Sequence, residues 1–289
     1  MTRKHPDLIT FGDEHGPHEV SVVDKAELAQ ALTEPSKCDN ESSWYVAELP
    51  SKGRAGYSEK VFYRNLLGRD EKMIASATAK NFKMVILDVL KSLMRDKALF
   101  SQLTLDDRDF LLMWIWANNY STERQMSITC EACGHRDNFK VDLTGIPVKD
   151  LSEDYQQPFP LTLSNGEVVT LRLKTVSDEQ KAEAIVAQNP DLDIEQVELA
   201  LTTQFKTVMN IRQKLKAMEA LTGKDNALIR TFHEYFSYGL KKSLEHECSS
   251  CQEVTTFAFP FHAGDFLPTL HDDFGALLQA SKRAKAESN

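Results

Sequence analysis

Four of the five cysteines in this 289-residue chain form two C-x-x-C pairs, Cys130 with Cys133 and Cys248 with Cys251. This spacing lets one backbone turn present two thiolates to a single ion, and two such turns complete a tetrahedral Cys₄ site. The pairs therefore predict one Zn²⁺ ion bound by all four side chains. Because four thiolates leave no open coordination position, the predicted ion is structural and not catalytic.

The segments beside each pair indicate a tight turn that feeds a β-strand, which is the build of a zinc ribbon. Gly134, directly after the first pair, suits the positive φ that such turns often need. Gln252 holds the equivalent place in the second turn and is a weaker fit. The flanking segments are residues 127–129 and 138–141 for the first pair, and residues 245–247 and 254–259 for the second.

The separation of the pairs departs from that of a compact ribbon, in which roughly 15–20 residues lie between them. Here the interval from Gly134 to Glu247 contains 114 residues. We therefore expect a ribbon interrupted by an inserted domain. Redox-active or unrelated cysteines remain alternatives, although neither pair lies in a clear βαβ thioredoxin-like pattern. A disulfide framework suits small secreted proteins, and the N-terminus has no signal-peptide pattern.

Other residues that could do chemistry have ordinary structural explanations. Asp106, Asp107 and Asp109 resemble a catalytic acidic cluster, but carboxylates in the first turn of a helix commonly cap it and complement its dipole. His135 and His246 are spare metal ligands beside a complete Cys₄ shell. The sequence has no P-loop, G-x-G-x-x-G, H-E-x-x-H or G-x-S-x-G motif. We therefore predict no catalytic residues and no enzyme activity.

Composition limits the classes of function further. A chain of this length with 42% hydrophobic residues can form one large core or two domains. Its net charge of −9 disfavours nucleic-acid binding, because such proteins usually carry a basic field. The longest apolar run, residues 110–117, is too short to span a bilayer. We expect a soluble protein made in a reducing cytosol.

The segments before the first cysteine pair are predicted to be mostly helical. Residues 44–49 and 61–64 are typical of strands, and residues 70–100 show a helical pattern. Thr104 is a candidate N-cap for the next helix. Residues 110–116 make that helix apolar nearly all round, so it should be a buried core helix.

Between the two cysteine pairs the sequence predicts a β-hairpin followed by helices. Asn165-Gly166 between two alternating runs is a strong hairpin signal. Ser177 with Gln180 resembles a capping box for the first helix. His233 is expected on the third helix as a packed or surface residue. The expected elements are strands at 159–163 and 168–173 and helices at 177–189, 194–223 and 226–244.

Together these patterns predict an α+β fold with a helix-rich core, small antiparallel β elements and an interrupted Cys₄ zinc ribbon. Apolar segments 20–23 and 257–267 are candidates for partner contacts, although the second could instead pack under the ribbon. The N-terminal arm could equally be a partly disordered tail. The predicted parts are an N-terminal arm (1–43), a core with the split ribbon (44–144 and 245–270), an inserted β-hairpin plus helical domain (145–244), and a tail (271–289).

Five motifs in fixed order resemble the baseplate hub and hub assembly proteins of T-even-type contractile-tailed bacteriophages. The resemblance covers residues 44–260. It implies a non-enzymatic part of the virion baseplate or an assembly chaperone, assembled in the host cytoplasm. Its partners would be other baseplate hub, wedge or tail proteins, with homo-oligomerisation open and with no nucleic acid or membrane. The motifs are Leu49-Pro-Ser-Lys-Gly53, the segment LTLDDRDFLL at 103–112, Cys130-Glu-Ala-Cys133-Gly134, LTLSNGEV at 161–168, and Leu171-Arg-Leu173.

The alternative function is a zinc-ribbon adaptor that binds nucleic acid or transcription machinery. The acidic balance of the chain and the lack of basic residues beside the cysteine turns disfavour it.

Overall fold

The computed structural model describes residues 44–259. Within this range the chain forms seven α-helices and small sheets in which every strand pairing is antiparallel, so the predicted α+β class is confirmed. None of the helices in this range is both long enough and apolar enough to cross a membrane. The predicted N-terminal arm with its segment 20–23, the tail 271–289 and most of segment 257–267 lie outside the described residues.

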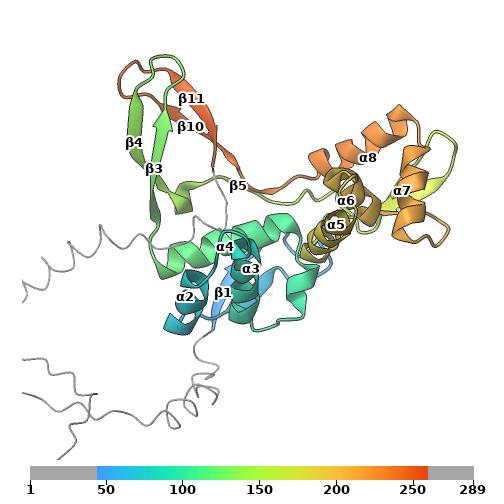
Figure 1. Cartoon of the computed structure of the whole chain (residues 1–289), viewed down its shortest axis with the longest axis horizontal. Helices are drawn as coiled ribbons and strands as arrows, with labels where there is room; N and C mark the ends of the chain where they lie inside the picture. Colours follow the sequence, from blue (N-terminus) through green and yellow to red (C-terminus); the bar gives the residue numbers. More distant parts are fainter. Residues whose placement is uncertain (1–43, 260–289) are drawn as a thin grey trace, which may run out of the picture. The chain divides into compact units, whose positions relative to one another are not determined.

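The first hydrophobic cluster gathers buried residues between Ala47 and Ile146, together with Val176, Leu240 and Phe259. Strand β1 pairs with β2, Val46 opposite Phe62, and three helices follow (Figure 1). These elements are β1 (Tyr45–Glu48), β2 (Lys60–Tyr63), α2 (Gly68–Ala75), α3 (Phe82–Leu93), the 3₁₀ turn η2 (Leu99–Gln102) and α4 (Leu105–Asn119).

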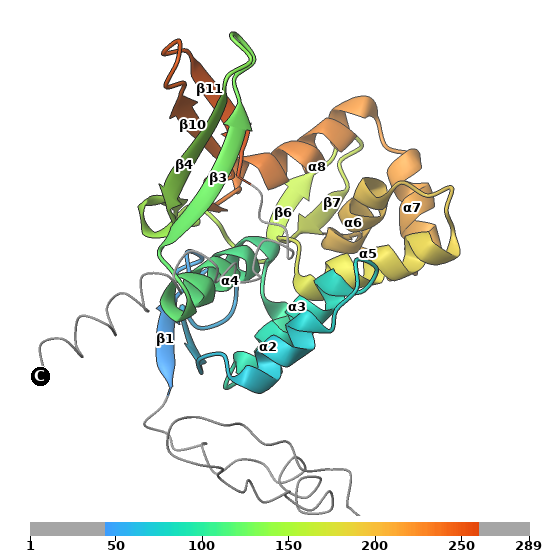
Figure 2. The ribbon, with the colours of Figure 1, turned by 60° about the vertical axis from the view of Figure 1, so that its left-hand side comes forward.

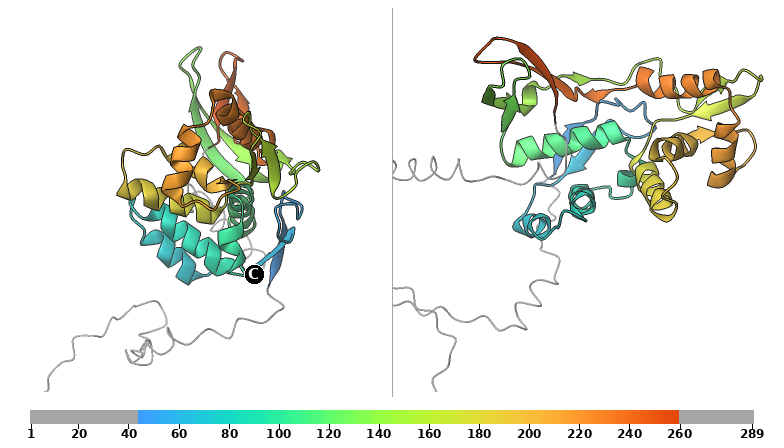
Figure 3. Two further views of the ribbon diagram at one scale, coloured as in Figure 1. Left: turned by 90° about the vertical axis from the view of Figure 1, so that its right-hand side faces the viewer. Right: turned by 45° about the horizontal axis from the view of Figure 1, so that its top comes forward.

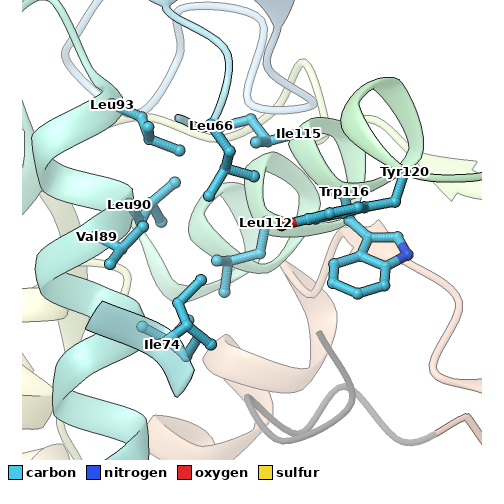
Figure 4. Close-up of a pocket in the computed structure, with 10 residues that line it drawn as sticks. Leu66, Ile74, Val89, Leu90, Leu93, Leu112, Ile115, Trp116 and Tyr120 are labelled. Atoms are coloured by element: carbon cyan, nitrogen blue, oxygen red, sulfur yellow. The ribbon is translucent and has the colours of Figure 1, made fainter. Parts of the chain in front are cut away.

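Apolar side chains from α2, α3 and α4 converge on one another (Figure 4). Ile74 of α2, Leu90 of α3 and Ile115 of α4 are all buried, and the cavity left among these helices is only about 40 Å³. The apolar α4 is thus a core helix, as its sequence predicts. Burial of its apolar surface supplies much of the stability of this cluster.

The helical pattern over residues 70–100 is not one helix. After α2, the backbone N–H and hydroxyl of Thr78 donate to Asn81 Oδ1 at 2.7 and 2.9 Å, which closes a polar turn before α3. Helix α3 ends at Leu93 because the following residue, Met94, forms a bridge to Tyr63 at the end of β2. Pairing with a distant strand replaces the next helical turn.

The second hydrophobic cluster gathers buried residues between Leu151 and Tyr238. Its three-stranded sheet has the order β6-β7-β8, and the hairpin turn lies at Asn165-Gly166 as predicted, with Gly166 at φ 82°. The elements are β6 (Phe159–Thr162), β7 (Val168–Leu171), α5 (Val176–Gln188), α6 (Ile194–Thr202), β8 (Thr203–Gln204), α7 (Ile211–Glu219) and α8 (Gly223–Tyr235).

The structure corrects the predicted extent of one helix and the predicted cap of another in this region. The expected helix 194–223 is divided into α6 and α7, because β-branched Thr203 and its neighbour Gln204 pair with β7 instead. The cap of α5 is Thr175, whose capping box uses Asp178, and not Ser177 with Gln180.

The helix expected over residues 226–244 is also corrected. It corresponds to α8, which ends at Tyr235. Gly239 adopts φ 82°, which a helix cannot continue through, and the chain passes into strands. Those strands are β9 (Gly239–Leu240) and β10 (Ser243–Glu247).

A short strand pair joins the two ends of the chain segment that carries the second cluster. Strand β5 (Val148–Lys149) pairs with β9, with Lys149 opposite Gly239. The backbone N–H of Lys241 also donates to the carbonyl of Pro147 at 2.9 Å. The chain therefore enters and leaves this segment at neighbouring positions.

A buried polar network surrounds the N-terminus of α4, where Thr104 is the predicted cap. The Asp107 carboxylate accepts bonds from Ser51 N at 3.1 Å and from Tyr57 Oη at 2.6 Å. The Thr104 hydroxyl also bonds the hydroxyl of Tyr238, beside the second cluster. Asp107 is fully buried, and both of its carboxylate oxygens accept hydrogen bonds, as buried polar groups require.

His233 of α8 is a packed histidine, with Nε2 3.3 Å from Thr202 Oγ1. Burial, followed by the charges of Lys174 and Arg172, lowers the pKa of His233 to about 4. Between pH 6.5 and 4 the unfolded chain therefore binds a proton that the folded chain does not. Stability conferred by neutral His233 is complete above pH 6.5 and is lost as the pH falls toward 4.

We predict that His233→Gln flattens the pH dependence of stability between pH 6.5 and 4. The titration of His233 accounts for up to about 3 kcal/mol of unfolding free energy over this interval. The measurement is the unfolding free energy from denaturant titrations at several pH values, compared between wild type and variant. The comparison is needed because Asp106, whose pKa burial raises to about 6, titrates in the same range in both proteins. Equal pH slopes in both proteins would contradict the prediction.

Candidate metal centre

Two β-hairpins carry the two cysteine pairs. Strand β3 (Glu123–Thr129) pairs with β4 (Arg136–Asp142), and β10 pairs with β11 (Val254–Ala258). The hairpins lie side by side in the views of Figures 1 and 2 and in the left panel of Figure 3, although their sequences are far apart. In each hairpin the C-x-x-C turn is the connection between the two strands.

Alternate residues of each hairpin face the other hairpin. The Phe139 ring of β4 stacks on His246 of β10 with centroids 3.9 Å apart and meets Phe257 of β11 edge-on at 5.7 Å. Phe257 and Phe259 pack into the first hydrophobic cluster, as expected if this segment lies under the ribbon strands. These aromatic contacts hold the hairpins together through their shared face.

The two cysteine turns have matching backbone hydrogen bonds. In the first, Gly134 N donates to Cys130 O at 2.9 Å, and in the second Gln252 N donates to Cys248 O at 2.9 Å. The N–H of each leading cysteine donates to the carbonyl five residues later, in His135 or Glu253. Gly134 has φ 72° and Gln252 has φ 62°, so the predicted positive φ occurs in both turns, once in a non-glycine residue.

The four cysteine Sγ atoms lie within 4.8 Å of one another. The Sγ atoms of Cys130 and Cys251 are 3.7 Å apart, and so are those of Cys133 and Cys248. These distances are far longer than the roughly 2.05 Å of a disulfide bond. They match the edge of about 3.8 Å of a tetrahedron with sulfur 2.3 Å from its centre. The cluster thus has the donors and the size for a tetrahedral metal ion.

The thiols of the cluster differ in acidity. The backbone N–H of Cys133 is the largest influence on Cys130, and with the other N–H and S–H donors it lowers the pKa of that thiol to about 7. At Cys251 the N–H of Glu253 acts in the same direction, but the other thiols outweigh it and raise the pKa to about 12. One thiolate therefore disfavours the ionisation of the next thiol. The positive charge of a bound cation would favour the thiolates and remove this effect.

Asp137 connects the two turns and was not anticipated from the sequence. Its carboxylate accepts bonds from the backbone N–H of Ser249 at 2.9 Å and from the hydroxyl of the same residue. These Ser249 donors, with His246, hold the pKa of Asp137 below its usual range. The signal in the sequence is an acidic residue in the same alternation as Phe139, which faces the opposite hairpin.

The two histidines considered as spare ligands bind Asp137 instead. His246 Nε2 is 3.1 Å and His135 Nε2 is 3.3 Å from a carboxylate oxygen of Asp137. They belong to the layer behind the cysteines, and this layer orients the turns that present the sulfurs.

The family described as T4 bacteriophage base plate protein matches residues 43–261. The chain belongs to this family. The match includes both hairpins and all four clustered cysteines, so this T4-type phage baseplate protein carries its candidate metal centre within the family region. No curated protein and no solved structure matches the chain.

We predict that Asp137→Asn lowers the affinity of the cysteine cluster for Zn²⁺ by roughly 10–100-fold, the usual effect of losing a supporting partner behind a metal ligand. The reason is that one Asp137 oxygen accepts from the Ser249 N–H and His246 while the other accepts from the Ser249 hydroxyl, and an amide has only one acceptor oxygen. Competition with a chromogenic chelator measures the affinity. Asn138→Ala, at the exposed neighbouring position, is the control and should leave the affinity unchanged. Equal affinities of Asp137→Asn and wild type would contradict this role.

Proposed function

We propose that this T4-type baseplate protein is a non-enzymatic component of the central hub of a contractile tail. In this proposal it holds other baseplate, wedge or tail proteins together and is stabilised by one structural Zn²⁺. The observation that carries the proposal is the convergence of four cysteine sulfurs from two C-x-x-C pairs with 114 residues between them, within a baseplate family region. The five motifs described above support the hub assignment within the family.

Zinc suits the donor set better than other common ions. Cys130, Cys133, Cys248 and Cys251 would hold it, and four thiolates in a tetrahedron favour Zn²⁺ over Mg²⁺ or Ca²⁺, which prefer oxygen ligands. Once these thiolates are bound, no position remains for water or substrate. In this proposal the ion completes an interrupted zinc ribbon made of the two hairpins.

We further propose that residues 145–244 form an inserted domain between the halves of a core made of residues 44–144 and 245–270. Two observations support this division. The second hydrophobic cluster lies within residues 151–238, and the strands β5 and β9 pair at the two ends of that segment. The insertion would be an additional protein-binding surface.

We predict that the purified protein contains one Zn²⁺ per chain and that Cys248→Ser loses it. The variant should melt at a lower temperature, and the amides of β10 and β11 should exchange faster, because the metal closes a long loop. Elemental analysis, thermal unfolding and hydrogen exchange measure these effects. Cys38→Ser, which removes the fifth cysteine, is the matched control and should keep the zinc and the melting temperature. Zinc-free wild-type protein would contradict the metal proposal.

We predict that the protein is part of purified phage particles and that deleting residues 1–43 prevents its incorporation without unfolding it. The arm has sparse apolar residues, so it should not hold the core, yet it is long enough to reach a partner. Quantitative mass spectrometry of particles, with zinc content and circular dichroism of the truncated protein, tests both parts. Unfolding of the truncated protein would place the arm in the core, and normal incorporation would assign the contacts to other surfaces.

A further inference from the structure

The solvent-facing side of the sheet β6-β7-β8 borders a cavity of about 390 Å³. Thr170 and Gln204 are register partners, and Arg172 lies two residues further along the same strand direction, so their side chains share this face. The opposite face presents Val169 and Leu171 to the second hydrophobic cluster. The cavity therefore lies on the polar side of a sheet whose other side is core.

The walls of the cavity come from the end of α6, the loop before α7 and α7 itself. Val208 and Met209 of the loop line one side, and Lys214 of α7 lines another. Val208 is 98% exposed, so an apolar side chain stands beside the opening. Arg172 and Lys214 are the charged residues of the lining, which includes no carboxylate from the described residues.

The two cations differ in how they are satisfied. The Arg172 guanidinium bonds both oxygens of Asp178, and its Nη2 also donates to the carbonyl of Leu201 at 3.2 Å. The Asp178 carboxylate therefore neutralises the charge of Arg172. Lys214 Nζ donates one proton to the carbonyl of Thr203 at 2.8 Å and forms no ion pair with any residue between 44 and 259.

The half-buried Lys214 ammonium thus has donors left over, and the nearest opposing charge, the Asp178 carboxylate, is already bound by Arg172. Burial and the neighbouring Arg172 lower the pKa of Lys214, which indicates that the charge is costly in this position. A carboxylate in the cavity would accept the remaining donors and balance the charge.

We propose that this cavity binds an acidic side chain of a partner polypeptide, with the carboxylate on Lys214 and an adjacent apolar residue against Val208. The favoured occupant is a polypeptide and not a small carboxylate, because the opening combines a cation with an exposed apolar side chain. A polypeptide can cover both, whereas a free anion leaves Val208 in water. The choice of a polypeptide rests on the proposed structural role in the baseplate, but the carboxylate site rests on the cavity alone.

The test uses the full-length, zinc-loaded chain and NMR titration, with the amides of Thr203 and Lys214 as reporters. The probes are acetyl-Val-Glu-Val-Glu-amide, its neutral counterpart acetyl-Val-Gln-Val-Gln-amide, and succinate as the free carboxylate. The proposal expects saturable binding of the Glu peptide, none of the Gln peptide, and weaker binding of succinate. Succinate binding as tightly as the Glu peptide would overturn the polypeptide occupant.

Variants locate the site. Lys214→Met should weaken Glu-peptide binding by about tenfold, the loss expected for one charge-assisted hydrogen bond. Lys214→Arg keeps the charge and should bind within about threefold of wild type by the same reasoning. Lys216→Met, at an exposed position of the same helix, is the control and should bind like wild type.

Equal binding of the Glu peptide by wild type and Lys214→Met, or no binding by wild type, would overturn the proposal. Thermal unfolding of each variant separates lost binding from lost folding. If Lys214→Met does not fold, Lys214→Gln replaces it, because glutamine also removes the charge but keeps an N–H donor for the Thr203 carbonyl. These titrations do not depend on particle incorporation. Failure of the hub proposal and failure of this site are therefore distinguishable.

Discussion

The constraint on which the two hairpins depend is the meeting of four sulfurs from turns that are 114 residues apart in the chain. Closing a flexible loop of that length costs about 4 kcal/mol of conformational free energy. Part of this cost is offset before any ion binds, because the hairpins share the contacts of Phe139 with His246 and Phe257, and Asp137 reaches across to Ser249. The sulfur positions thus follow from a framework of ordinary packing and hydrogen bonds.

Features encoded by neighbouring residues could be predicted from the sequence. The cysteine turns, the hairpin at Asn165-Gly166, the cap at Thr104 and the positive φ at Gly134 each depend on a few adjacent residues, and all four occur in the structure. Helix boundaries set by distant strands could not be predicted. Leu93 ends α3 because Met94 meets β2, and the segment after α6 leaves the helix because it pairs with β7.

The same division between local and distant causes explains what was missed around the candidate site. Asp137 appears in the sequence as one more charged residue of a strand, and only the opposite hairpin supplies the donors that it accepts. Asp107 lies in the first turn of α4 as expected, but its burial depends on Ser51 and Tyr57, which no spacing rule connects to it. Lys214 likewise faces a cavity because three separate elements converge there.

The pairing of β5 with β9 has a consequence for how such a protein can change over generations. Lys149 and Gly239 are direct strand partners, so their Cα atoms lie about 5 Å apart, a gap that a two-residue turn spans. A single recombination event at these two positions could remove, replace or enlarge everything between them while the cysteine hairpins kept their strand ends. Lineages could therefore exchange this segment without rebuilding the fold that carries it.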